Sequence, residues 1–214
     1  MAQTACCLRM VELLAMRLCH DLAGPLGTVG AALALAEEDE ASVAEACALA
    51  AEAAQVTVGR LRMLQAAWGE PAPRTRRELR NLTAALARKG LLLEMPADDT
   101  VMPAALARLL LNAVMLAAAS LPRGGRVTVS EVADGGFLLE IAGPQAAWPP
   151  HLGRYLADAA DAQAAFDDEE EGQPRAMLAP LTALFAHQAR LRLTLLLPAT
   201  GDAPPPLLLA PDTP

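Results

Sequence analysis

The N-terminal part of the chain places its apolar side chains at the spacing of an α-helix. They recur in steps of three and four residues, at Val11, Leu14, Leu18, Leu22, Leu26, Val29 and Leu33. Because an α-helix completes a turn in about 3.6 residues, these positions share one side. The pattern predicts a long amphipathic helix from about Cys7 to Glu37, followed by a short polar turn with the sequence EEDE.

A second stretch repeats this spacing and predicts a second helix, from about Ser42 to Trp68. Its apolar positions are Val43, Cys47, Ala54, Val58, Leu61, Leu64 and Trp68. Ser42 and Glu45 have the spacing of a capping box, in which two side chains satisfy backbone N–H groups at the start of a helix. Two long helices joined by a short turn form an antiparallel hairpin, which cannot bury both apolar stripes well. Two hairpins can cover each other in a four-helix bundle, so we expect a homodimer.

The pattern becomes mixed after the breaker WGEPAPR at residues 68–74. Strands are expected at 91–95, 126–132, 137–143 and 191–198, the second and third joined by an Asp-Gly turn. Helices are expected at 76–90, from Pro103 to about 121, at 149–160 and at 175–189, where Pro180 can introduce a kink. This order is typical of a two-layer α/β sandwich of about 130 residues.

The chain is therefore expected to have an α+β fold in three parts. Residues 1–70 form the helical hairpin, residues 74–200 form the α/β domain, and residues 201–214 form a proline-rich tail. Within that tail, the segment PPPLLLAP at 204–211 can add an edge strand to the sheet.

Composition narrows the classes of function. Hydrophobic residues make up 54% of the chain, enough for a real core, whereas only 3% are aromatic and the net charge is −8. Few rings and an acidic balance argue against binding to nucleic acids or anionic membranes. Arg9 and Glu12 interrupt the apolar N-terminus, so it does not resemble a secretion signal, and the most apolar segment, 106–121, is too short to span a membrane. We expect a cytoplasmic protein.

The stretch RLCHDLAGPLG at residues 17–27 is unusual inside a helix, because it contains two glycines and a proline. At about 100° per residue, His20 lies opposite the apolar side and is expected to be exposed. The neighbours that share its side are all small: Gly24, Gly27, Thr28 and Ala31. Together with Pro25 they favour a docking face that another protein can approach closely, although a simple kink stays an alternative.

An exposed histidine beside an acid suits phosphoryl transfer. A neutral imidazole is nucleophilic near pH 7, because its pKa is about 6.5. Asp21 can hold the second ring N–H and stabilise positive charge on the ring, although it must reach sideways from the next helix position. Arg17, one turn before His20, is expected to meet an acidic partner or a phosphoryl oxygen. Arg60 and Arg62 on the second helix either assist it or are ordinary surface charges.

These residues resemble a known family. The segment LCHDLAGPLG on the first helix is similar to the phosphoacceptor motif of histidine-kinase dimerisation domains, and residues 7–200 resemble the ChpT-type histidine phosphotransferases. The resemblance implies a dimeric helical hairpin followed by a degenerate kinase-type ATPase domain. It also implies reversible transfer between His20 and aspartates of receiver domains, which belong to a hybrid histidine kinase and to response regulators. The receiver would supply Mg²⁺, and the chain itself would hold no cofactor or metal.

Departures from true kinases imply that this chain does not bind ATP. Asn112 matches the kinase asparagine, but Arg108 stands where kinases usually have an acid or a histidine. Residues 143–145, with the sequence GPQ, replace the Asp-x-Gly-x-Gly loop. We therefore expect Asn112 to be structural and expect no self-phosphorylation. Gly24 stands where many kinases carry Thr or Asn, which puts a phosphatase reaction in doubt.

Two other functions stay open, an ATP-dependent histidine kinase with a divergent nucleotide site and a dimeric scaffold in which His20 is idle. His151 and His187 lie near helix ends and are expected to serve in packing or capping. The cysteines at positions 6, 7, 19 and 47 lack metal-ligand spacing, so we expect free thiols used as small apolar residues.

Overall fold

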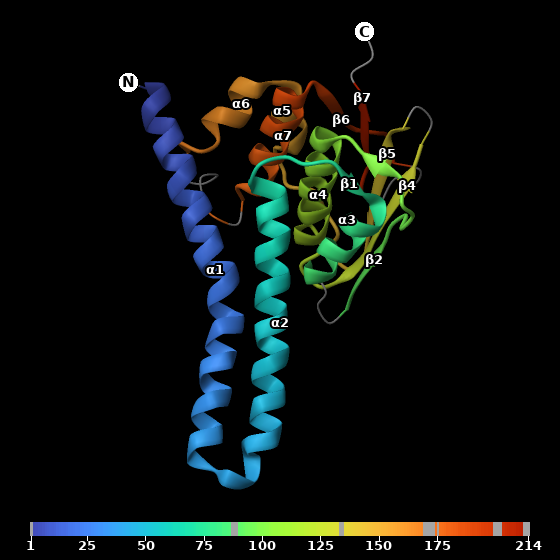
Figure 1. The fold of residues 1–214 in the computed structure, drawn as a ribbon. Helices are drawn as coiled ribbons and strands as arrows, with labels where there is room; N and C mark the ends of the chain where they lie inside the picture. The colour runs from blue at the N-terminus through green and yellow to red at the C-terminus, as the bar shows by residue number, and fades with distance from the viewer. Residues whose placement is uncertain are drawn as a thin grey trace.

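The computed structural model describes residues 2–86, 90–132, 135–168, 174, 176–198 and 203–211, with side chains from residue 8 onward. It has two parts, a long helical hairpin and an α/β domain that lies beside the end of the hairpin away from its turn (Figure 1). This arrangement confirms the predicted α+β class.

The hairpin consists of α1 (Ala2–Glu38) and α2 (Val43–Trp68), joined by the short 3-10 helix η1 (Glu40–Ser42). Both predicted helices are confirmed, but the predicted capping box is wrong. Ser42 makes no side-chain cap on α2; its hydroxyl donates to Asp39, whose carboxylate also accepts the Ala41 N–H at 3.0 Å. Asp39 has the extended backbone of an N-cap and Ser42 does not. The hydrogen bonds from Ser42 and Ala41 lower the pKa of the Asp39 carboxyl.

Several of the large apolar side chains that remain exposed on the hairpin share one face. Between the helices the buried contacts are small residues, among them Ala32, Ala46, Ala50 and Ala53. The exposed apolar face consists of Val11, Leu26, Leu33, Val43, Val58 and Leu61. At about 100° per residue, these positions lie roughly a quarter turn around each helix from the buried alanines where the two helices touch. Because the helices are antiparallel, a rotation in the same sense on each brings the two sets to the same face of the hairpin.

One helix among the described residues, Leu8–Glu38, is long and apolar enough to cross a membrane by length and composition, with a mean hydropathy of 1.3. The same composition fits a helix whose apolar face is covered by another protein helix.

The α/β domain is built on a five-stranded sheet in the order β2-β4-β5-β7-β6. Its strands are β2 (Leu91–Glu94), β4 (Gly125–Glu131), β5 (Phe137–Ala142), β6 (Leu191–Leu195) and β7 (Leu207–Pro211). β2 pairs parallel with β4, and the other neighbours pair antiparallel, which confirms the predicted pairing of β4 with β5. Residues 133–134 of the predicted turn lie outside the described residues. A separate pair, β1 (Arg74–Thr75) with β3 (Val101–Met102), was too short to predict.

The C-terminal segment corrects one prediction. β7 lies between β5 and β6, so residues 207–211 belong to the interior of the sheet and not to a tail or an edge strand. Leu207 and Leu209 are fully buried, whereas Leu208 between them is half-buried, as in a strand packed on one face. Trp148 anchors the preceding residues by donating its Nε1–H to the Pro205 carbonyl at 2.7 Å. The run of prolines concealed the strand, because proline is rare inside sheets.

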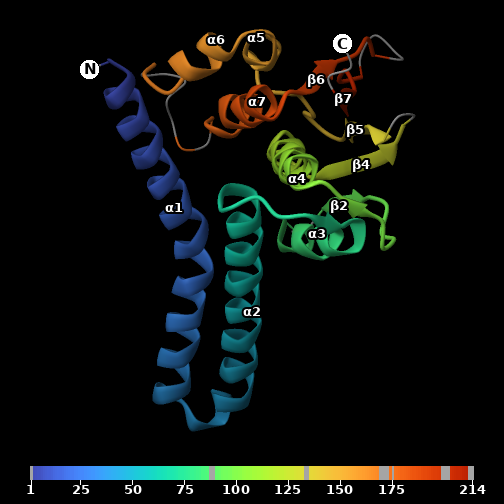
Figure 2. The ribbon, with the colours of Figure 1, turned by 45° about the horizontal axis from the view of Figure 1, so that its top comes forward.

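Helices cover one face of the sheet, as the predicted two-layer sandwich requires (Figures 1 and 2). They are α3 (Arg76–Thr83), η2 (Ala84–Leu86), α4 (Ala104–Ala119), α5 (Leu152–Ala157), α6 (Ala159–Ala164) and α7 (Leu178–Ala189). The single helix predicted at 149–160 is split, because Asp158 is extended and caps α6 by accepting the Ala160 N–H at 2.8 Å. Pro180 lies in the first turn of α7, where no intrahelical donor is needed, so it imposes no kink.

Two side chains of α4 bind the last turn of α2 and join the two parts of the molecule. Arg108 donates to the carbonyls of Ala67, Trp68 and Gly69 at 3.2, 3.3 and 2.8 Å. These carbonyls form the negative end of the helix dipole, where a cation is favourable. Asn112, one turn later and fully buried, donates to the Ala67 carbonyl at 3.1 Å and accepts the Trp68 Nε1–H at 3.1 Å.

Replacing Asn112 with alanine is expected to destabilise this joint. The substitution removes the acceptor of the Trp68 indole N–H, and an unsatisfied donor of this kind costs about 1–3 kcal/mol. Urea unfolding followed by tryptophan fluorescence measures the loss. The matched control is Asn81→Ala on the exposed side of α3. An Asn112→Ala variant as stable as the control would contradict the role given to Asn112.

Candidate functional site

His20 lies near the middle of α1, and its side chain is 59% exposed, as predicted. Counted around the helix, it lies on the face of the hairpin opposite the exposed apolar face. Leu18 and Leu22, on the apolar side, are half-buried. The imidazole is therefore open to an approaching molecule, while its helix is held by the hairpin and the α/β domain.

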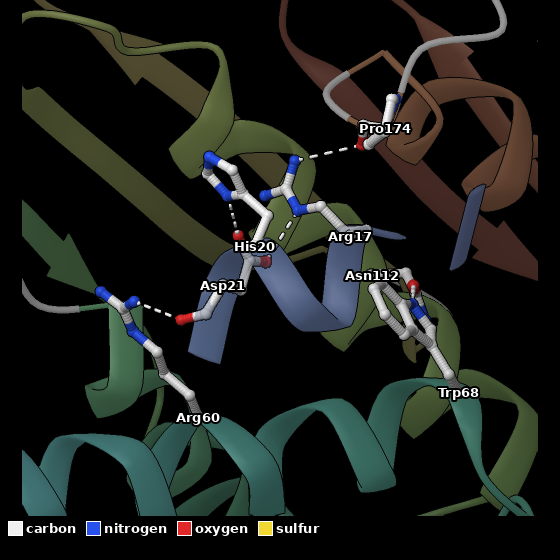
Figure 3. Close-up of polar contacts among 7 residues, drawn as sticks. All are labelled: Arg17, His20, Asp21, Arg60, Trp68, Asn112 and Pro174. Atoms are coloured by element: carbon white, nitrogen blue, oxygen red, sulfur yellow. Dashed lines mark hydrogen bonds and ion pairs between the residues drawn. The ribbon is translucent and has the colours of Figure 1, made fainter. Parts of the chain in front are cut away.

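The carboxylate of Asp21 lies between His20 and Arg17 (Figure 3). Its Oδ1 is 3.2 Å from His20 Nδ1, and its Oδ2 accepts the Arg17 Nε–H at 2.7 Å. The Asp21 and Arg17 side chains are only 20% and 18% exposed. Asp21 does reach sideways to its neighbour on the helix, as the sequence predicts.

This contact decides which ring nitrogen is available. A carboxylate can only accept a hydrogen bond, so the contact requires the proton of neutral His20 to lie on Nδ1. Nε2 then carries the free lone pair and is the nucleophilic nitrogen. The arrangement can accept an electrophilic group at Nε2 and offset the resulting positive charge through Asp21.

Arg17 lies beneath His20 and not on the open face, where it was expected. Besides its bond to Asp21, its Nη1 donates to the Pro174 carbonyl at 3.4 Å, from the segment that leads into α7 (Figure 3). Arg60 of α2 donates its Nη1–H to the Asp21 backbone carbonyl at 2.8 Å. Arg60 thus contacts the site, whereas Arg62 is exposed, and whether Arg60 assists the chemistry stays a prediction.

A cavity of about 180 Å³ lies where these arginines meet the α/β domain. Its polar side is formed by Arg17, Asp21 and Arg60. Its apolar side comes from four elements, α2, η2, α4 and α7, and consists of Met63, Leu64, Ala85, Leu86, Met115 and Leu178. The site is therefore built jointly by the hairpin and the α/β domain.

A shallow groove of about 420 Å³ runs between α1 and α2 next to His20. Three of the predicted docking residues line it: Gly24, Pro25 and Thr28. The others, Gly27 and Ala31, are exposed, and a Cβ added at Gly24 or Gly27 would meet nothing within 4 Å beyond the neighbouring backbone of α1 itself. The residues of α2 that line the groove were not predicted from the sequence as docking residues. They are Leu49, Glu52, Ala53, Val56 and Arg60. Leu49 and Val56 are two helical turns apart, and this spacing is the feature of the sequence that could have indicated an apolar surface on this side of α2.

The remaining candidates lie away from this site. His187 donates its Nε2–H to the Tyr155 carbonyl at 2.9 Å, because a carbonyl oxygen can only accept, and His151 lies edge-on to the Tyr155 ring, so both serve in packing. Cys19 and Cys47 are free, as predicted, but exposed and not in apolar surroundings. The side chains of residues 6 and 7 lie outside the described residues. Within the described part of the chain, no group of three or more His, Cys, Asp or Glu residues could hold a metal ion.

Comparison with known proteins identifies the family to which this chain belongs. The fold is similar to that of a solved structure described as a bacterial phosphotransferase, with a TM-score of 0.70 and 23% identity over 94% of this chain and 95% of that chain. Among curated proteins, none matches this sequence significantly. The family model of the histidine phosphotransferase C-terminal domain matches residues 75–201, which is more than half of the chain. The chain therefore belongs to the histidine phosphotransferase family.

Proposed function

We propose that this protein shuttles a phosphoryl group between receiver-domain aspartates through His20, in a bacterial two-component phosphorelay in the cytoplasm. The observation that carries the proposal is the exposed imidazole whose Nδ1 side is held by a half-buried carboxylate. Membership of the histidine phosphotransferase family supports the same chemistry.

In the proposed first step, the Nε2 lone pair of His20 attacks the phosphorus of an aspartyl phosphate on a receiver. The N–P bond forms while the P–O bond breaks, and the aspartate carboxylate leaves with the bonding electron pair. The Nδ1 proton stays on the ring, so the phosphorylated imidazole is cationic, and the Asp21 carboxylate offsets that charge from 3.2 Å. The second step reverses these bonds on another receiver. A Mg²⁺ ion held by the receiver neutralises the phosphoryl oxygens.

The groove beside His20 is the proposed docking surface for the receiver. Gly24 has no side chain and leaves the α1 backbone open at the groove, and Leu49 and Val56 of α2 present apolar surface on its other side. Glu52 and Arg60 add one charge of each sign along the groove. Such a surface combines apolar contact with polar groups that set orientation, as protein interfaces commonly do.

Two features support transfer without ATP. Arg108 and Asn112 are engaged in binding the end of α2, so the asparagine amide is already satisfied. Residues 143–145, which replace the kinase glycine loop, start at a glycine whose Cβ would meet the Gly124 carbonyl at 2.7 Å, so backbone fills the space beside it. The alternative, an ATP-dependent histidine kinase, needs the Asn112 amide and the space beside residues 143–145 to be free for the nucleotide.

We also propose that the protein is a homodimer. The exposed apolar face of the hairpin matches the face that a second hairpin would cover in a four-helix bundle. It lies opposite His20, so dimerisation leaves both phosphoacceptor sites accessible. A scaffold in which His20 is idle would have the same dimer, and only the transfer reaction distinguishes the two.

Purified full-length protein is expected to gain a phosphoryl group from a phosphorylated receiver domain and to pass it to a second receiver. His20→Ala is expected to abolish both steps, because it removes the imidazole that the Asp21 carboxylate holds with its nucleophilic nitrogen exposed. Transfer of ³²P between the proteins, resolved on gels, measures the reaction.

The control for this experiment is His151→Ala, which is expected to transfer at the wild-type rate. Relay by His20→Ala would show that another residue carries the phosphoryl group, and absence of relay in the wild type would favour the scaffold. Labelling of His20 by ATP alone would favour the kinase.

Val58→Glu is expected to convert the dimer to a monomer, because the charge would be buried in the bundle at a large desolvation cost. The matched control is Val56→Glu, two residues away on the groove side of α2. That variant is expected to stay dimeric and to need a higher receiver concentration for half-maximal transfer. Light scattering after size-exclusion chromatography gives the mass. A dimeric Val58→Glu, or a monomeric wild type, would contradict the proposed dimer face.

A further inference from the structure

We infer that Arg17 is a positioning residue that holds Asp21 in line with His20, and that through it the α/β domain takes part in phosphoryl transfer. The inference rests on the proposed function of His20. The hydrogen bonds of Arg17 go to Asp21 and Pro174 and not to the imidazole, so it acts through Asp21 and not on the reacting atoms.

The first step of the argument is the geometry of Asp21. Its two oxygens have separate partners, Arg17 Nε at 2.7 Å on Oδ2 and His20 Nδ1 at 3.2 Å on Oδ1. The strong, short bond is the one to Arg17, as expected when both groups are charged. The bond to His20 is the longer one and joins consecutive residues that do not share a helix face. The orientation of the carboxylate is therefore set by Arg17.

The second step concerns what Asp21 does for the imidazole. With Oδ1 in place, the Nδ1-protonated tautomer is favoured and Nε2 is nucleophilic. When Arg17 is removed, the carboxylate can rotate toward water, and the ring loses its preference for a proton on Nδ1. A larger fraction of His20 then carries its proton on Nε2 and cannot attack phosphorus.

The third step links Arg17 to the α/β domain. Its Nη1 donates to the Pro174 carbonyl at 3.4 Å, across 157 positions of sequence. One turn earlier on α1, Leu13 is fully buried in a cluster with Phe166, Met177 and Leu181. Phe166 and Met177, which precede and follow Pro174 in the sequence, therefore pack against α1, and the Pro174 carbonyl binds a different nitrogen of the guanidinium from the one that binds Asp21. The planar fork of an arginine can serve both acceptors at once, which a lysine cannot do in the same way.

The decisive experiment measures the His20 tautomer and the transfer rate in full-length Arg17→Ala and Arg17→Lys. Nitrogen-15 NMR of the imidazole is expected to show an Nδ1-protonated ring in the wild type and a mixture of tautomers in Arg17→Ala. Transfer from a phosphorylated receiver at saturating concentration is expected to fall about 10- to 100-fold, as for other losses of alignment. The receiver concentration for half-maximal transfer is expected to change little. Arg17→Lys is expected to recover part of both properties.

The matched control is Arg9→Ala, which removes an arginine paired with an acid on the same helix two turns away from the site. It is expected to keep the wild-type tautomer and rate. A wild-type tautomer in Arg17→Ala would overturn the inference, even if transfer were slower because of a less stable fold, which urea unfolding detects. If the wild type itself accepted no phosphoryl group, the proposed function would fail, while the tautomer measurement would still decide the role of Arg17.

Discussion

The binding of the end of α2 by α4 is the interaction on which the rest of the structure depends. Arg108 and Asn112 satisfy carbonyls that the end of a helix leaves without partners, and they do so from the centre of the α/β domain. The same guanidinium lies over the Phe185 ring, 4.2 Å from its centroid, so α7 joins the contact. Because this joint holds the domain against the hairpin, the Pro174 carbonyl of the domain lies within hydrogen-bonding distance of Arg17 on α1.

The hairpin presents its apolar surface and its histidine site on opposite faces. One face exposes a set of large aliphatic side chains that suits a second hairpin, and the other exposes His20 and a shallow groove that Leu49 and Val56 line. The separation follows from helix geometry, since positions two residues apart on α2, such as Val56 and Val58, differ by about 200°. A dimer formed on the apolar face would leave each His20 free to meet a receiver, as the proposed function requires.

The site could be predicted in part. The exposure of His20, the sideways reach of Asp21 and the open backbone at Gly24 follow from residue spacing on one helix, and the structure agrees with each. The contribution of α2 to the groove and the inward position of Arg17 were not predicted. Both depend on how α1 packs against other elements, and a helical wheel of α1 contains no information about them.

The sequence by itself determined the elements and their inner and outer sides, because the period of apolar residues records which side of each helix or strand meets the core. It also determined that a histidine stands on the outer side of α1 next to an acid. Tertiary structure alone decided that β7 enters the middle of the sheet, that Asn112 serves the joint, and that Arg17 turns toward Pro174. Each of these depends on contacts between residues far apart in the chain, whose pairing leaves no local pattern.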